Sequence, residues 1–225
     1  MKIIVDAFGG DNAPLEILKG CEMAVCEYDI DIILVGDEAI IKDVANKNNI
    51  SLKCMEIADA KQVITMEDDA SAVIKSKKDS SMALGLKLLK ESKGDAFVSA
   101  GNSGALVMGA TFIIKRIKGI KRCAFAPVIP KNVGAFMLID SGANIDCKPQ
   151  MLHQFALMGS IYMNKVMNIK NPRVGLANVG VEEHKGGDLQ KQTFKLLKED
   201  GNVNFVGNVE ARTITDDAAD VIVCD

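Results

Sequence analysis

KIIVDAFGGDNAP, residues 2–14, is the stretch that decides the fold. The run at 2–6 is rich in β-branched residues and predicts a strand, and a helical pattern begins at Leu15. Gly9 and Gly10 allow the backbone to turn tightly between the two elements and to approach a ligand closely. Free amide groups at the start of a helix favour an anion. The turn therefore either binds an anion or simply joins a strand to a helix.

The same alternation continues along the chain. We expect strands at 2–6, 32–35, 52–56, 96–99, 133–140, 174–177, 203–206 and 221–224, and helices at 15–28, 38–47, 81–92, 103–118, 149–167 and 187–200. Strands that alternate with helices predict an α/β protein with a mainly parallel sheet covered on both faces. Runs at 124–129 and 133–138 flank Pro130-Lys131-Asn132, which predicts one antiparallel hairpin.

Composition limits the possible classes of function. The 225 residues are 48% hydrophobic and 25% charged with a net charge of -3, which is typical of a globular chain and does not favour nucleic-acid binding. The six cysteines form no CxxC pair and there are only 2 histidines, so we expect reduced thiols and no metal site. Acidic residues appear early, which argues against a signal peptide and favours a cytoplasmic location.

Glycine-bearing loops follow several of the expected strands. They are DAFGGDNAP at 6–14, SAGNSGA at 99–105, DSGANIDCKP at 140–149 and NVGVEEHKGGD at 178–188. Ligands of open α/β sheets bind outside the carboxyl ends of the strands. We therefore expect these loops to converge on one cleft, shaped at the first loop by Asp6, Gly9, Gly10 and Asp11.

The SAGNSGA loop is the best candidate for holding an anion. Its glycines expose backbone amides, its polar side chains add donors, and a helix is expected to begin at its end. The residues assigned to phosphate binding are Ser99, Gly101, Asn102, Ser103 and Gly104. No Gly-Lys-Ser/Thr follows and the spacing is not GxGxxG, so neither a P-loop nor a dinucleotide fingerprint is present. The alternative is an ordinary serine cap of a helix.

Two further loops carry ionisable groups. Lys185 is placed to give positive charge to a phosphate or a developing oxyanion, and His184 to act as an acid or base. The alternative for this EEHKGG segment is a solvated charged loop. Asp140 and Asn144 either orient a ligand or bond to the backbone of their own loop.

A basic run stands out on an acidic chain. It consists of Lys115, Arg116, Lys118, Lys121 and Arg122, interleaved with isoleucines. One interpretation is that these charges complement the C-terminal dipole of the helix expected at 103–118. The other is that they dock an acidic partner or an anionic membrane surface.

Taken together, these motifs resemble those of the PlsX family, the bacterial phosphate acyltransferases of phospholipid synthesis. DAFGGDNAP resembles the DAMGGDxAP opening of that family, with Phe8 where Met is usual. Later blocks of the family are resembled, in the same order, by ITMED at 64–68, IKSKKDSS at 74–81, SAGNSGA, DSGANIDCKPQMLHQFALMG at 140–159, GVEEHKG at 180–186, VEAR at 209–212 and ADVIVCD at 219–225. The resemblance covers essentially the whole chain.

The resemblance implies a three-layer α/β/α sandwich similar to isocitrate and isopropylmalate dehydrogenases and to phosphotransacetylase. It implies synthesis of acyl phosphate from acyl-acyl-carrier-protein and inorganic phosphate, without a cofactor, by a cytoplasmic homodimer that associates peripherally with the membrane. The catalytic candidates are then Lys185, His184, Asp140 and Asn144, and the basic run docks the acyl carrier protein. The alternatives are a phosphotransacetylase or phosphotransbutyrylase that uses acyl-CoA, a dehydrogenase, and a membrane-associated scaffold without catalysis.

Members of that family continue from CD into GFxGN and further helices. We therefore expect residues 1–225 to form a single α/β domain that lacks its C-terminal part.

Overall fold

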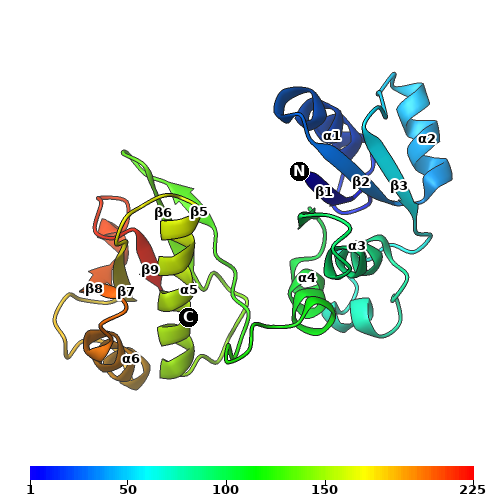
Figure 1. The fold of residues 1–225 in the computed structure, drawn as a ribbon. Coiled ribbons are helices and arrows are strands. Elements are labelled where there is room, and N and C mark those ends of the chain that lie inside the picture. Colours follow the sequence, from blue (N-terminus) through cyan, green and yellow to red (C-terminus); the bar gives the residue numbers. More distant parts are fainter. The chain divides into compact units, whose positions relative to one another are not determined.

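The structure, a computed structural model, describes all residues from 1 to 225 (Figure 1). The chain divides into two compact units, Met1–Ile117 and Lys118–Asp225, called unit 1 and unit 2 below. The single domain expected from the sequence stays a prediction, since two compact units can be parts of one domain.

Unit 1 is built on a parallel sheet of four strands in the order β3-β2-β1-β4. The strands are β1 Lys2–Asp6, β2 Asp31–Gly36, β3 Met55–Asp59 and β4 Ala96–Val98. The helices are α1 Leu15–Tyr28, α2 Glu38–Lys47, α3 Ser81–Lys90 and α4 Ser103–Gly109, with a 3-10 turn at Ala70–Ile74 and a π-helical turn at Ala110–Ile114.

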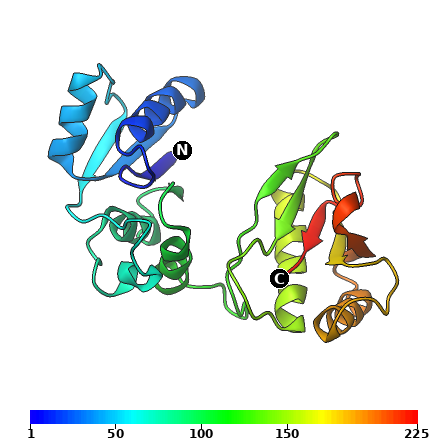
Figure 2. The same cartoon turned by 180° about the vertical axis from the view of Figure 1, so that it is seen from behind.

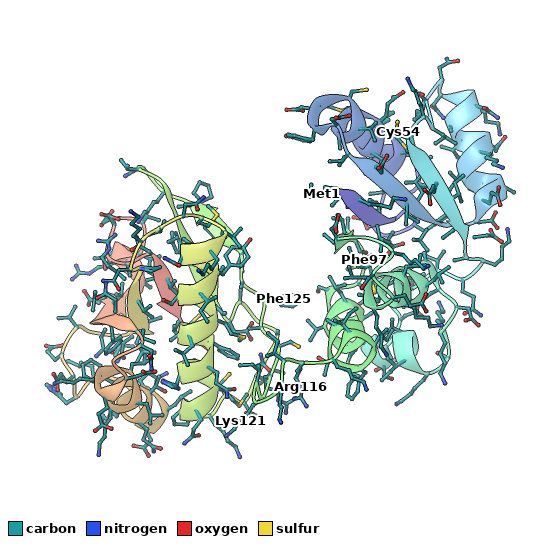
Figure 3. All side chains as sticks on the ribbon, viewed as in Figure 1. Met1, Cys54, Phe97, Arg116, Lys121 and Phe125 are labelled. Atoms are coloured by element: carbon teal, nitrogen blue, oxygen red, sulfur yellow. The ribbon has the colours of Figure 1, made fainter.

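Successive side chains of β1 enter different cores because they point to opposite faces of the sheet. Val5 packs with Leu18 of α1 and Ile41 of α2 on one face. Ile4 packs on the other face with Phe97 and the leucines of α3. In Figure 3 Phe97 lies beside α3, where its ring leaves no room for a side chain at Gly85. The sheet is therefore covered by α1 and α2 on one side and by α3 on the other.

Unit 2 contains a sheet of five strands in the order β5-β6-β9-β7-β8. Its elements are β5 Val128–Pro130, β6 Ala135–Ile139, α5 Pro149–Lys165, β7 Arg173–Asn178, α6 Asp188–Glu199, β8 Asn204–Glu210 and β9 Val221–Val223. Seen from behind in Figure 2, the green strands β5 and β6 and the red strand β9 lie in front of the yellow-green helix α5. β5 runs antiparallel to β6 and all other pairs are parallel, so the expected hairpin is confirmed.

An ion-pair network ties the start of β7 to the segment before β9. Arg173 donates to Asp220 at 2.9 Å and to Asp217 at 2.6 Å, and Lys131 Nζ lies 2.5 Å from Asp217. Hydrogen bonds from Arg173 and Lys131 lower the pKa of Asp217 to about 2. These residues lie at the amino ends of the parallel strands, opposite the glycine loops.

The structure corrects three expectations. The strands form two sheets, one in each unit, rather than one. β3 begins at Met55, later than the 52–56 expected, because residues 52–54 lead into it through a positive φ at Cys54. The helix expected at 103–118 ends at Ile114, since Lys115 has a φ of 76°. No helix of the structure is both long enough and apolar enough to cross a bilayer.

Candidate functional site

In unit 1 the glycine loops after β1 and β4 lie side by side, because these strands are parallel neighbours. The buried carboxylate of Asp6 joins them: its Oδ2 accepts a hydrogen bond from Ser99 Oγ at 2.8 Å. Its Oδ1 accepts from the amide of Phe8 at 3.2 Å. Ser99 Oγ in turn accepts from the amide of Gly101 at 3.1 Å. This chain of hydrogen bonds, called the Asp6–Ser99 junction below, fixes the two loops against each other.

Gly9 lies at the centre of the Asp6–Ser99 junction. A Cβ on Gly9 would lie 2.6 Å from Ser99 Oγ, 2.8 Å from Asp6 Oδ2 and 2.9 Å from the amide nitrogen of Gly101. Gly10 has a φ of 111°, a conformation that other residues rarely adopt. Gly9 is therefore required by close packing and Gly10 by its backbone conformation, and the cleft-shaping role of both stays a prediction.

Asn102 is buried, and its side chain forms hydrogen bonds with the protein backbone. Its Nδ2 donates to the carbonyl oxygens of Thr65 at 3.2 Å and Asp68 at 3.1 Å, and its Oδ1 accepts from the amide of Ala105 at 3.0 Å. Asn102 thus caps α4 and holds the ITMED loop in place. This arrangement favours a positioning role over the direct phosphate contact expected from the sequence.

A lysine also braces the ITMED loop. Lys77 Nζ donates to Asp68 Oδ2 at 2.6 Å and to the carbonyl oxygen of Val63 at 2.8 Å. Its hydrogen bond lowers the pKa of Asp68, which also accepts from the amide of Thr65 at 2.7 Å. The loop is therefore anchored at both ends by side chains distant in sequence.

A cavity of about 250 Å³ lies between the ITMED loop and the glycine loops. Its lining includes Phe8, Gly10, Asp11, Thr65, Glu67 and Gly101. Ser103 and Gly104 are exposed at the start of α4. Sequence reasoning quoted ITMED as a motif but assigned no role to Thr65 or Glu67. Their place beside the glycine loops depends on a contact between segments far apart in the chain.

In unit 2 the buried Asp140 organises its own loop. Its Oδ1 accepts from the amides of Phe125 at 2.7 Å and Ser141 at 2.8 Å. Its Oδ2 accepts from the amide of Asn144 at 2.7 Å and from Asn144 Nδ2 at 2.9 Å, and Nδ2 also donates to the carbonyl oxygen of Cys123 at 2.8 Å. These contacts favour the backbone-bonding alternative over a ligand-orienting role.

The EEHKGG loop follows β7 at the same edge of the sheet as the Asp140 loop, because β6 and β7 both run parallel to β9. The backbone of Lys185 is held on both sides: its carbonyl accepts from Asn178 Nδ2 and its amide donates to the carbonyl of Glu182, both at 3.1 Å. Glu183 pairs with Lys198 rather than with Lys185. His184 is exposed. The loop therefore fixes the backbone of Lys185, and Glu183 does not neutralise the ammonium group of Lys185.

Asn208 of β8 was not anticipated as part of this region. Its Nδ2 donates to the carbonyl oxygen of Glu182 at 2.8 Å, while its Oδ1 is buried without a partner. Asn208 thereby supports the loop that carries Lys185. The available signal in the sequence is its place directly before the VEAR motif at 209–212.

The basic run is exposed and lies outside any helix. Its first two residues belong to unit 1 and its last three to unit 2. In unit 2 the amide of Lys121 donates to Gln154 Oε1 of α5 at 2.9 Å, which fixes the backbone there (Figure 3). The helix expected to reach residue 118 ends in the π-helical turn at Ile114, so the basic run follows the helical segment directly. Both interpretations of these charges, the helix dipole and docking, stay predictions.

The groups in these loops are therefore suited to binding an anion and to stabilising negative charge. Unit 1 presents backbone amides and the Ser103 hydroxyl at a helix start, and unit 2 presents Lys185 on an anchored loop. The structure contains no group of three or more His, Cys, Asp or Glu side chains placed to hold a metal ion.

The sequence matches the family described as "Fatty acid synthesis protein" over residues 1–225. A phosphate acyltransferase of Acetivibrio thermocellus is 50% identical over 226 residues, covering 100% of this chain and 66% of its own length. A phosphate acyltransferase of Alkaliphilus oremlandii is 51% identical over 225 residues, covering 100% of this chain and 67% of its own length. The chain thus spans about two thirds of the length of these curated relatives.

Two solved structures have a similar fold. The EutD phosphotransacetylase from Staphylococcus aureus superposes with a TM-score of 0.70 at 17% identity, covering 99% of this chain and 77% of its own. A phosphotransacetylase from Streptococcus pyogenes gives 0.71 at 17% identity, covering 99% and 76%. These similarities and the mainly parallel sheets confirm the expected three-layer α/β fold.

Proposed function

Because the chain belongs to the fatty acid synthesis protein family, we propose that the complete protein is a phosphate acyltransferase that forms acyl phosphate from acyl-acyl-carrier-protein and inorganic phosphate for phospholipid synthesis. The observation that carries the proposal is identity of 50% and 51%, along the whole chain, to relatives named phosphate acyltransferase. The low-identity likeness to phosphotransacetylases supports the fold and leaves the acyl donor to be tested.

The reaction makes modest chemical demands. A phosphate oxygen attacks the carbonyl carbon of the thioester, a carbon–oxygen bond forms, and the carbon–sulfur bond breaks with the electron pair leaving on the thiolate. Phosphate is already anionic and a thiolate leaves readily, so little proton transfer is needed. The protein must instead hold phosphate beside the carbonyl and stabilise the developing oxyanion.

Phosphate binding is assigned to unit 1. The backbone amides of Ser103 and Gly104 and the exposed Ser103 hydroxyl are suitable donors at the start of α4, whereas the amide of Gly101 already donates to Ser99 Oγ. The Ser99 hydroxyl donates a hydrogen bond to Asp6 and accepts one from the amide of Gly101. Its role is therefore to shape the loop rather than to donate to phosphate. Asn102 likewise positions the ITMED loop beside the cavity.

Charge stabilisation is assigned to Lys185. Its loop is anchored through Asn178 and Asn208, which limits how far the ammonium group can move. His184 is exposed on the same loop and has the weaker role of a proton carrier. Asp140 and Asn144 support the region through their own loop.

The partners are proposed from charge. An acidic carrier protein approaching an acidic chain needs a local basic surface, and the exposed basic run of residues 115–122 supplies one. We assign docking of acyl carrier protein to this run. A cytoplasmic homodimer with peripheral membrane association completes the proposal and rests on the family resemblance alone.

The test is acyl phosphate formation by the complete protein from radiolabelled phosphate and either acyl-acyl-carrier-protein or acyl-CoA. Faster formation with the carrier-protein thioester supports the proposal. Preference for acyl-CoA would instead assign the protein to the phosphotransacetylase class. If folded protein made no product from either donor yet still bound liposomes, the scaffold alternative would replace the enzymatic one.

A further inference from the structure

Gly180 lies under the side chain of Lys185. It follows the end of β7 and is buried, although its neighbours Val179 and Val181 are 79% and 62% exposed. A Cβ placed on Gly180 would lie 3.1 Å from Cγ and 3.3 Å from Cδ of Lys185. The aliphatic part of the lysine therefore lies across the glycine and shields it from solvent.

The conformation of Gly180 does not itself call for a glycine. Its φ lies outside the left-handed range, unlike the φ of Gly142 at 94° and that of Gly186 at 81°. A side chain at position 180 would instead meet Lys185 and, at 2.9 Å from its Cβ, Oε2 of Glu182. The space above Gly180 is thus filled by two side chains of its own loop, and that space is what a larger residue would take.

The backbone of Lys185 is fixed independently of this contact. Its carbonyl oxygen accepts from Asn178 Nδ2 and its amide donates to the carbonyl oxygen of Glu182, both at 3.1 Å. The carbonyl oxygen of Glu182 also accepts from Asn208 Nδ2 at 2.8 Å. A lysine held at its backbone and again along Cγ and Cδ has few ways to place its ammonium group. The contact with Gly180 therefore supplies the second point that determines where the charge lies.

The ammonium group of Lys185 is not neutralised by the acids of its loop. Lys185 forms no ion pair in the structure, and Glu183 pairs with Lys198. Glu182 shares the space above Gly180 with the lysine but also forms no ion pair with it. The positive charge therefore remains available to an anion or to a developing oxyanion.

We propose that Gly180 is a positioning residue for Lys185: because Gly180 has no side chain, the lysine lies across it and carries its ammonium group to the place where negative charge develops. The proposal rests on the proposed role of Lys185 in the reaction. Alanine at position 180 would push the lysine aside by a few tenths of an ångström, and valine would take the place of Cγ and Cδ. Misplacing a catalytic group by about 1 Å can cost about a hundredfold in rate, so the loss should grow with the size of the side chain.

Turnover of the complete protein with acyl-acyl-carrier-protein and phosphate tests the proposal. Gly180→Ala should lower kcat about three- to tenfold and Gly180→Val about a hundredfold, with the KM for the acyl donor unchanged. Gly187→Ala is the matched control in the same loop and should keep a normal kcat. Its added Cβ would approach only the flexible end of Gln190, at 3.3 Å, and its φ is -79°.

A double-mutant cycle separates positioning from general damage to the loop. In the Lys185→Ala background, Gly180→Val should cause no further loss of kcat, because the group that it displaces is already absent. An equal loss in both backgrounds, or a normal kcat of Gly180→Val alone, would overturn the proposal. Near-normal turnover of Lys185→Ala would overturn it as well, because no charge would then need to be positioned.

Acetylation by isotopically labelled acetic anhydride gives a readout that does not need turnover. Mass spectrometry of the folded, complete protein compares the rate at Lys185 with the rate at Lys191 of α6. Gly180→Val should change the Lys185 rate at least about threefold and leave the Lys191 rate unchanged, since the reactivity of an amine follows its solvation and its neighbours. Gly187→Ala should change neither rate.

The two readouts distinguish failure of this proposal from failure of the proposed function. Absence of acyl phosphate from the unmodified protein would contradict the proposed function, and a changed Lys185 rate in Gly180→Val would still support the contact between the two residues. An unchanged Lys185 rate would overturn the positioning by Gly180 whether or not the protein makes acyl phosphate.

Discussion

Asp6 and Asp140 lie at equivalent positions of their sheets but form hydrogen bonds with different kinds of partner. Each is a buried aspartate at the carboxyl end of a parallel strand, followed by a glycine-bearing loop. Asp140 accepts hydrogen bonds from the backbone amides of Phe125, Ser141 and Asn144 and from the Asn144 side chain. Asp6 accepts from the side chain of Ser99, which is 93 residues away, and so joins the glycine loops that follow two neighbouring strands.

The difference teaches how to separate structural from functional loops. A carboxylate whose hydrogen bonds all come from backbone amides and one asparagine side chain close by holds that region rigid and leaves no acceptor for a ligand. A carboxylate that links two loops sets the distance between them, and with it the spacing of any donors they present. We therefore assign ligand binding in unit 1 to the loops around Asp6, and a supporting role in unit 2 to Asp140.

The largest expected effect comes from truncating these two carboxylates. Asp140→Ala leaves the amides of Phe125, Ser141 and Asn144 without their acceptor, which should lower the unfolding free energy by about 3 kcal/mol or more. Asp6→Ala should cost about 1–2 kcal/mol, because the hydroxyl of Ser99 can turn to another acceptor. Urea denaturation of the complete protein measures both, and equal losses would remove the distinction.

Lys185→Ala tests whether unit 2 supplies a positive charge that stabilises the developing oxyanion. Turnover should fall about ten- to a thousandfold, the scale of losing an oxyanion donor, while the unfolding curve stays unchanged. Lys191→Ala, an exposed lysine on α6, is the matched control and should keep normal turnover. Near-normal turnover of the Lys185 variant would rule out the role of that lysine.

Two glycines sharpen the comparison. Gly9→Ala forces a Cβ to within 2.9 Å of the Gly101 backbone nitrogen, so the two glycine loops must move apart at a cost of about 1–3 kcal/mol. At Gly142, which has a φ of 94° and no atom within 4 Å of an added Cβ, alanine should cost only about 1 kcal/mol of backbone strain. Acyl phosphate formation should be lost in the first variant and kept in the second. Loss of activity in both would contradict the account.

The charge network of unit 2 gives a smaller, pH-dependent effect. Arg173 and Lys131 lower the pKa of Asp217 to about 2, against about 3.9 in an unfolded chain. The stabilisation is present above pH 3.9 and is lost as the pH falls toward about 2. Thermal melts of the complete protein should show this loss, and Asp217→Asn should flatten it. An unchanged slope in that variant would assign the acid sensitivity to other carboxylates.

Local sequence signals predicted much of the fold. The helices at 15–28 and 38–47 have the bounds expected from their apolar periodicity, and the hairpin follows from its Pro-Lys-Asn turn. The resemblance to the PlsX phosphate acyltransferases is confirmed by the family match over residues 1–225. The helix expected at 103–118 was too long, because apolar residues continue past the left-handed residue Lys115 with no glycine or proline to mark the end.

Pairing between distant segments was harder to foresee. The division into two sheets depends on which strands are neighbours, and periodicity within a strand carries no information about its partners. The same reason hid Thr65 and Asn208, whose places beside the candidate loops arise from contacts across 37 and 26 residues. Asp6 and Ser99 were predicted as separate candidates, and the structure supplied the bond between them.

The most direct test of the account is the Michaelis constant for phosphate in Ser103→Ala of the complete protein. Ser103 is exposed at the start of α4, so its loss should not disturb the fold. The phosphate constant should rise about tenfold, the scale of one hydrogen bond to a charged group, while the acyl-donor constant and the Ser51→Ala control stay unchanged. Equal changes in the two constants, or no change in either, would contradict phosphate binding at this loop.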